Sequence, residues 1–256
     1  MVPLMKPSAS GRIMFWRGGS LWIGLAGEPA GMHAHHAVQF SLPFKGAVRF
    51  QLPGGRWKSY DAAIVAAQQP HSFEARGQLM AQVFVEPESR EGRRLQARYA
   101  NEGIADLPAG TLTTEIAALA RAYKARATDA ALIELTLAAI HKLAGAAPSP
   151  ASAPDARIAK ATELIRERLS GSVALKSIAD AVHLSPDRFR HLFMEQTGVG
   201  FRPYLLWLRI ECALAAYVGG STLTDAAHTG GFSDSAHFSR TFRKMFGIAP
   251  MSVRPE

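Results

Sequence analysis

Two stretches in the C-terminal half of the chain carry polar and basic side chains at spacings that suit contacts with nucleic acid. They contain Asp187, Arg188, Arg190 and His191 in the first stretch, and Ser235, Ser239, Arg240, Arg243 and Lys244 in the second. Arginine bound by two hydrogen bonds to guanine is the commonest base-specific contact in the major groove of DNA. Arg190 and Arg240 are therefore interpreted as base readers. The other cations of the second stretch, with Arg209, are interpreted as phosphate contacts or solvated charges. Asp187 has two open roles, because its carboxylate can accept from cytosine or cap its own helix.

The second stretch lies in a predicted helix that follows a turn and a polar cap at Gly231-Phe232-Ser233. Phenylalanine recurs at every fourth position, at Phe238, Phe242 and Phe246, which predicts one apolar helix face. Gly247 is the glycine that commonly ends a helix. The basic residues fall on the other faces, so this helix presents a surface that fits a major groove.

The same arrangement occurs earlier, between residues 175 and 198. A short predicted helix ends at a turn around His183, and Ser185 then caps a second helix that has Pro186 at its first position. The apolar face of that second helix comprises Phe189, Leu192 and Phe193. Gly198 closes it. Two helix-turn-helix units with matching caps, aromatic residues and terminal glycines are thus expected.

A predicted helix over residues 203–218 connects the two units. Its length of roughly 24 Å, with the flanking turns, allows the two recognition helices to lie about one DNA turn apart, ~34 Å. One chain would then occupy two successive major grooves on one face of the duplex. The alternative is a helical bundle that binds protein, but a bundle has no need of the doubled caps and glycines.

These residues resemble the DNA-binding domain of the AraC/XylS transcription regulators over residues 156–254. The most specific parts are Leu184-Ser185-Pro186, Phe193, Gly198, the helix from Tyr204 to Ala215 with Arg209, and Gly231 to Pro250. The resemblance implies base contacts at the positions of Asp187, Arg190, His191 and Arg240. It also implies a sequence-specific transcription regulator and not an enzyme.

The sequence departs from the family pattern at two positions in the second unit. Ala226 and Gly230 stand where the family usually carries bulky aliphatic side chains. Smaller side chains predict looser packing of this unit and weaker DNA binding by this unit alone.

The composition is that of an ordinary globular protein. The 256 residues are 48% hydrophobic and 20% charged, and this length suggests two domains. The net charge of +8 suits a polyanionic partner, yet residues 1–143 carry 16 basic and 11 acidic side chains, and residues 144–256 carry 13 and 10. The inference of DNA binding therefore rests on the design of the helices and not on bulk charge.

A cytoplasmic location is expected. The single cysteine, Cys212, lies in an apolar run, is interpreted as a small core residue and fits a reducing cytosol. Arg12 and Arg17 interrupt any signal-peptide pattern, and no apolar run approaches the roughly 18 residues of a membrane span. No membrane partner is therefore expected.

The N-terminal part is expected to be a small β-barrel or jelly roll. Short strands are predicted at 12–16, 21–25, 37–42, 48–52, 62–67 and 79–85, with a hairpin turn at Gly54-Gly55. Helices are predicted over 112–126 and 129–143. The expected fold is α+β, with a sensor and dimerisation domain at residues 1–143, a flexible linker at 144–155 and an all-α double helix-turn-helix domain at 156–256.

The sequence His33-Ala34-His35-His36 precedes a predicted strand, and Gln39 and Gly46 follow. This resembles the first cupin motif, with Gln39 in place of the usual acid, and His71 falls where the second cupin motif has its histidine. The resemblance implies a cupin-like sensor domain. In metal-binding cupins, residues at the positions of His33, His35, Gln39 and His71 converge inside the barrel. His36, next to His35 on a strand, is expected to face outward.

The resemblance leaves three alternatives for this pocket. In the favoured one, it holds a small organic effector and no metal, no cofactor is required, and His35 and His71 form hydrogen bonds beside Trp22, Phe40 and Phe50. In the second, His33, His35 and His71 bind a divalent metal, and the chain is a metal-sensing or metal-dependent cupin protein fused to a DNA-binding domain. In the third, the sensor is degenerate, the barrel is closed and the regulator is constitutive.

The expected partners follow from this organisation. They are double-stranded DNA through its major groove, an unidentified small-molecule effector, and a second copy of the chain. The two helices after the barrel are the expected homodimer interface, since stripes of leucine and alanine suit close helix pairing; the alternative is that these helices only cover the barrel. The resemblance also allows a contact with RNA polymerase.

Overall fold

The computed structural model describes residues 9–108, 110–145 and 155–255, which form two compact units. The first unit contains residues up to 149 together with residues 242–256, and the second contains residues 150–241. The first is β-rich and the second is helical, as the sequence predicts. Most of the predicted linker, residues 146–154, lies outside the described residues. Among the described helices, none combines the length and the apolar character needed to cross a membrane.

Two β-sheets build the first unit. The larger sheet has the strand order β10 (Ile104–Asp106), β7 (Ala63–Val65), β4 (Val38–Pro43), β9 (Leu79–Val85), β2 (Gly19–Ala26), β1 (Ala9–Trp16) and β11 (Val253–Pro255). The smaller sheet has the order β3 (Ala30–His33), β8 (His71–Glu74), β5 (Val48–Gln51) and β6 (Lys58–Tyr60). Neighbouring strands are antiparallel, except that β1 and β11 run parallel.

Successive side chains of a strand point to opposite faces of the sheet, and this alternation divides the core into two clusters. Ala63 and Val65 of β7 pack with Val48 and Phe50 of the smaller sheet. Ile64, between them in the sequence, belongs to the other cluster. This is the period of two expected for a strand buried on both faces. Phe40 also lies in the second cluster, so Phe40 and Phe50 are core residues. Neither is among the lining residues of the cavity described below, although the Phe50 ring lies 5.5 Å from that of His71.

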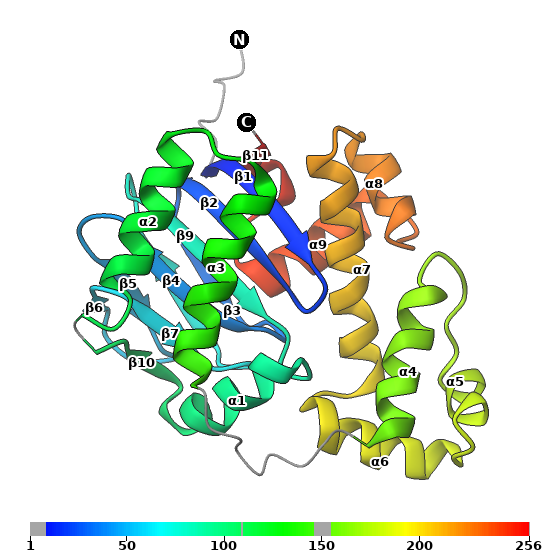
Figure 1. Cartoon of the computed structure of the whole chain (residues 1–256). Helices are drawn as coiled ribbons and strands as arrows, with labels where there is room; N and C mark the ends of the chain where they lie inside the picture. The colour runs from blue at the N-terminus through cyan, green and yellow to red at the C-terminus, as the bar shows by residue number, and fades with distance from the viewer. Residues whose placement is uncertain (1–8, 109, 146–154, 256) are drawn as a thin grey trace. The chain divides into compact units, whose positions relative to one another are not determined.

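Helices cover the outer face of the larger sheet (Figure 1). They are α1 (Arg90–Tyr99), α2 (Thr113–Lys124) and α3 (Asp129–Ala144), and the 3-10 turn η1 (Ala100–Glu102) follows α1. Leu119 of α2 and Leu132 and Ile140 of α3 are buried in the cluster that contains Phe40. The predicted apolar stripes therefore pack on the sheet. Whether other faces of these helices pair with a second chain stays a prediction.

The second unit is a set of helices with an aromatic core. It contains α4 (Ala156–Glu167), α5 (Leu175–Ala181), α6 (Pro186–Thr197), α7 (Phe201–Val218), α8 (Leu223–Thr229) and the start of α9 (Ser235–Phe246). The ring of Phe193 lies 5.2 Å from those of both Phe189 and Tyr204. Cys212 of α7 is half-buried, and burial raises the pKa of its thiol, which agrees with a packing role.

The C-terminal residues complete the first unit. Trp22 of β2 lies 4.9 Å from the ring of Phe246 and 6.2 Å from that of Phe242. The Gly31 amide donates to the Gly247 carbonyl at 3.1 Å, the 3-10 turn η2 (Pro250–Ser252) follows, and β11 then pairs with β1. The last part of the chain is thus a structural part of the β-rich unit.

Candidate nucleic-acid interface and buried histidines

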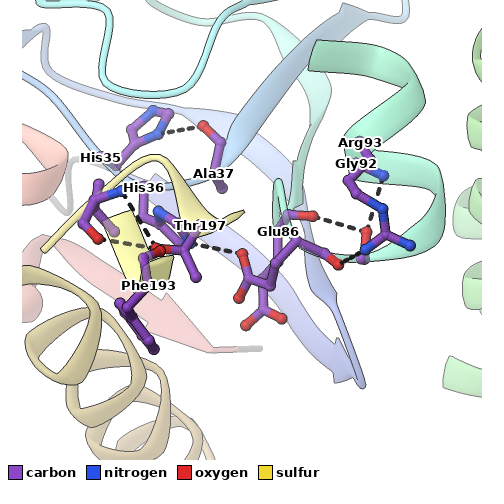
Figure 2. Close-up of polar contacts among 11 residues, drawn as sticks. His35, His36, Ala37, Glu86, Gly92, Arg93, Phe193 and Thr197 are labelled. Carbon is purple, nitrogen blue, oxygen red and sulfur yellow. Dashed lines mark hydrogen bonds and ion pairs between the residues drawn. The ribbon is translucent and has the colours of Figure 1, made fainter. Parts of the chain in front are cut away.

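The first helix-turn-helix unit consists of α5, a turn and α6. The Ser185 hydroxyl accepts a hydrogen bond from the Arg188 amide at 3.3 Å, and Pro186 begins α6. Gly198 ends the helix with a φ of 75°, a conformation that favours glycine, and its amide donates to the Met194 carbonyl at 2.8 Å. The Thr197 hydroxyl donates back to the Phe193 carbonyl at 2.8 Å (Figure 2). These contacts hold the last turn of α6.

The four predicted residues of α6 are all exposed. They are Asp187, Arg188, Arg190 and His191. The Arg190 guanidinium forms an ion pair with the Asp187 carboxylate, and His191 Nδ1 lies 2.8 Å from the Asp187 carbonyl. Because Ser185 supplies the cap oxygen, Asp187 is not the N-cap of this helix. Its carboxylate instead restrains Arg190.

The second helix-turn-helix unit, which consists of α8, a turn and α9, is tightly packed, contrary to the expectation of looser packing. Thr222 caps α8 by accepting from the Asp225 amide at 3.1 Å. Ala226 is fully buried. A Cβ on Gly230 would lie 2.5 Å from the Arg209 carbonyl oxygen and 2.7 Å from the Ala213 Cβ. The small residues therefore allow a close approach of α8 to α7 and leave no gap.

Asp234 supplies the cap of α9, and not Ser233 as the sequence suggested. The Asp234 carboxylate accepts from the His237 amide at 2.7 Å, and this hydrogen bond holds the pKa of the carboxyl below its usual range. Phe232 and Phe238 are buried with their rings 5.4 Å apart. They are core residues, as predicted.

The predicted residues of α9 differ in exposure. Arg240, Arg243 and Lys244 are exposed, whereas Ser235 and Ser239 are half-buried. Arg209 is also half-buried, and its guanidinium donates to the Gly171 carbonyl at 3.5 Å. The sequence predicted a phosphate contact or a solvated charge for Arg209. The hydrogen bond to Gly171 is a structural contact that this prediction missed.

Three histidines converge inside the β-rich unit. His33 on β3 is paired with His71 on β8, and His35 follows in the loop before β4. All three are buried, and one potential ligand atom of each lies within 4.8 Å of the others. Removal from water, together with the neighbouring imidazoles, lowers the pKa of His35 to about 3 and that of His71 to about 2. Burial lowers the pKa of His33 as well, so the three rings are neutral near pH 7.

Polar side chains surround this cluster. The Gln39 side-chain amide lies 2.7 Å from His35 Nε2 and 3.0 Å from the Ser41 hydroxyl, which in turn donates to Gln82. Ser41 and Gln82 were not singled out in the sequence. Gln82 stands opposite Ser41 in the β4–β9 register, a pairing that no local pattern reveals.

The expectation for His36 is wrong. His36 is buried, and its Nε2 lies 2.8 Å from a Glu88 carboxylate oxygen. Residues 34–37 do not form a strand, so the alternation that predicted an outward side chain does not apply.

A cavity lies beside the histidines. Trp22, His33, Gln39, Gln82, Phe84 and Phe246 are among its lining residues, together with other mainly apolar side chains. Of the predicted pocket residues, Trp22, His33 and Gln39 line this cavity, whereas His35 and His71 do not. A degenerate sensor was expected to have a closed barrel, so the cavity removes that argument for a constitutive regulator.

Comparisons with known proteins agree with the geometry of the helical part. Residues 178–256 match the family described as "Helix-turn-helix domain". The regulator YijO of Escherichia coli is 33% identical over 113 residues, which are 44% of this chain and 40% of that protein. The arabinose operon regulatory protein of Escherichia coli is 32% identical over 102 residues, 39% of this chain and 35% of that protein. This chain thus spans less than half the length of these relatives.

Solved structures extend the likeness to the β-rich part. ToxT from Vibrio cholerae covers 91% of this chain and 95% of its own, with a TM-score of 0.59 and 13% identity. At this identity the likeness shows the fold alone: a β-rich N-terminal part followed by a helical one. The relatives named are regulators of transcription, so the matched family is not one of enzymes.

Proposed function

Because the C-terminal part of this chain belongs to the AraC/XylS family of transcription regulators, we propose that the whole protein is a cytoplasmic, sequence-specific regulator controlled by a small molecule. The observation that carries the proposal is the pair of capped helices, each with an exposed arginine in its second turn: Arg190 on α6 and Arg240 on α9. Capped, rigid helices bring such side chains to base edges at little entropic cost.

The contacts with DNA divide by chemistry. Arg190 and Arg240 read guanine, and His191, Arg188 and the hydroxyls of α9 add hydrogen bonds to bases or phosphates. The exposed cations Arg243 and Lys244 neutralise phosphates, which supplies affinity without sequence information. The two helix-turn-helix units bind successive major grooves.

The cavity supports effector binding in the β-rich unit. Its walls are mainly apolar, and its polar lining residues are Arg12, Glu28, His33, Gln39 and Gln82. This lining suits a small, mainly apolar molecule that carries a hydrogen-bonding group. Two related proteins carry names that agree with ligand control. One ToxT structure holds an unsaturated fatty acid, and another relative is named for the arabinose operon. The effector shifts which arrangement on DNA the regulator prefers.

The test is selection of DNA from a random pool by the full-length protein, followed by footprinting. We expect one enriched sequence with protection over two successive major grooves. Recovery of unenriched DNA would contradict sequence-specific binding. A ligand found by thermal shift, if it changes neither affinity nor footprint nor transcription, would contradict effector control. The homodimer and the contact with RNA polymerase stay predictions, the first of which sedimentation tests.

A further inference from the structure

The three buried histidines share one hydrogen-bonding pattern. Nδ1 of His33 lies 2.7 Å from the Gly31 carbonyl, Nδ1 of His35 lies 2.9 Å from the Ala37 carbonyl (Figure 2), and Nδ1 of His71 lies 2.8 Å from the Gln69 carbonyl. A carbonyl oxygen only accepts, so each Nδ1 must carry the proton. A neutral imidazole has one N–H, which leaves the lone pair on Nε2 of each ring.

These backbone contacts prepare the rings for a shared cation. Metal-binding histidines almost always donate their second ring N–H to a backbone carbonyl or a carboxylate, which fixes the tautomer and the ring orientation. In this cluster all three rings are already held in that way. The ring centroids of His33 and His71 lie 4.2 Å apart, and those of His35 and His71 lie 5.4 Å apart.

One of these nitrogens lacks a partner. Nε2 of His71 is buried and forms no hydrogen bond within the described part of the chain. A buried acceptor left without a donor is destabilising, because it has lost its hydrogen bonds to water. His35 Nε2 faces the side-chain oxygen of Gln39 at 2.7 Å, which sets two acceptors against each other unless the amide is rotated. A bound cation would satisfy the lone pair of His71 Nε2.

We propose that His33, His35 and His71 form a binding site for a divalent transition-metal ion, with zinc as the best fit. Three imidazole nitrogens with an open fourth position are a common zinc arrangement, with Zn–N distances of about 2.0–2.1 Å. Tetrahedral ligands then lie roughly 3.4 Å apart. One ring nitrogen of each histidine already lies within 4.8 Å of the others, so the site needs only a further approach of the three rings.

The donor set also determines the metal preference. The cluster contains imidazoles and no carboxylate. Imidazole suits zinc, copper and nickel, whereas magnesium and calcium prefer carboxylate and carbonyl oxygen. Gln39, beside His35, is the position from which an anionic ligand would reach the ion. The site does not depend on the proposed DNA binding, but it shares His33 and Gln39 with the proposed effector cavity.

The experiment uses the full-length protein without an affinity tag and without chelator. After dialysis against Zn²⁺, elemental analysis should find one zinc per chain, and Co²⁺ should give the visible spectrum of a tetrahedral site. Binding should weaken at least tenfold in His33→Ala, His35→Ala and His71→Ala. His228→Ala, at an exposed histidine of α8, is the matched control and should bind as the unmodified protein does.

A second variant keeps the test decisive where a histidine variant does not fold. Gln39→Glu supplies a carboxylate without removing a histidine and should tighten Zn²⁺ binding roughly tenfold. Absence of bound zinc in the unmodified protein would overturn the site. Stoichiometric zinc that survives in the folded histidine variants, or unchanged affinity in Gln39→Glu, would overturn it as well.

Discussion

Arg190 and Arg240, the two candidate base-reading residues, differ in the contacts that they make within the chain. Arg190 is held by Asp187 one helical turn away, whereas no ion pair of Arg240 occurs among the described residues. Both side chains are exposed, so the difference lies in the partner: before it reaches guanine, Arg190 must exchange one acceptor for another. We therefore expect the free-energy cost of reaching guanine to be higher for Arg190 on α6 than for Arg240 on α9.

Arg240 and Lys244 should separate base reading from phosphate binding. Arg240→Ala should cost about 1–3 kcal/mol on the preferred site and relax the preference at one base pair. Lys244→Ala should weaken binding to all sequences alike and reduce the salt slope by about one. Titrations of selected and scrambled duplexes at several salt concentrations distinguish the two. A uniform loss in Arg240→Ala would identify Arg240 as a phosphate contact.

Asp187→Ala should increase binding to unrelated DNA, since it removes a negative charge from the interface and releases Arg190. Affinity for the selected site should rise less, so the ratio between the two should fall. The matched control is Asp180→Ala, which removes an exposed carboxylate paired with Lys176 on α5. Loss of preference at a single C·G pair, with no gain on unrelated DNA, would instead support contact with cytosine.

At the level of elements, Ala226 of α8 and Gly230, which follows α8, allow this helix to approach α7 closely. Gly230→Ala should destabilise the helical unit by about 1–3 kcal/mol, because its Cβ meets the Arg209 carbonyl and Ala213. Gly171→Ala is the control in the same unit, as its Cβ meets only one atom, at 3.7 Å. Thermal unfolding measures the difference. Equal stability of the two variants would show that α8 moves away from α7 without cost.

The success of sequence reasoning also varies by element. The strand at 79–85, the hairpin at Gly54-Gly55 and the helices α2, α3, α5, α6, α7 and α9 follow from local periodicity and caps, and their existence was predictable. The strands β3, β6, β8 and β10 were not predicted, because each is only three or four residues long, whereas the equally short β5 and β7 lie inside longer apolar or alternating runs. Helix α1 buries only Gly92, Leu95 and Tyr99, so its apolar stripe is narrow and was missed.

The predicted sites likewise divide into residues that the sequence identified and contacts that it did not. The convergence of His33, His35 and His71 was expected from the cupin resemblance, and the exposed residues of α6 followed from its helical pattern. The ion pair of Arg190, the burial of His36 against Glu88 and the role of Gln82 depend on rotamers and strand register. These are set by tertiary packing, which local sequence does not specify.

For the whole molecule, the assignment of residues 242–256 to the β-rich unit matters most. A fragment of residues 1–143 lacks Phe246 and β11, so Trp22 and the free edge of β1 become exposed. This fragment should bind more of a hydrophobic dye and unfold at a lower temperature than the β-rich unit in the full chain. Addition of a peptide of residues 242–256 should partly reverse both effects. A fragment as stable as the intact unit would contradict the prediction.

The parallel pairing of β1 with β11 joins residues about 240 positions apart and thereby affects the order of events during synthesis. The ribosome synthesises the chain from its N-terminus at about 5–20 residues per second. Strand β1 is therefore made on the order of ten seconds or more before β11, its last partner in the sheet. During this interval the nascent sheet keeps an unpaired edge and an uncovered tryptophan, which are features that chaperones bind and that favour aggregation. Synthesis of residues 242–255, and not of the β-rich segment itself, therefore determines when this unit can finish folding.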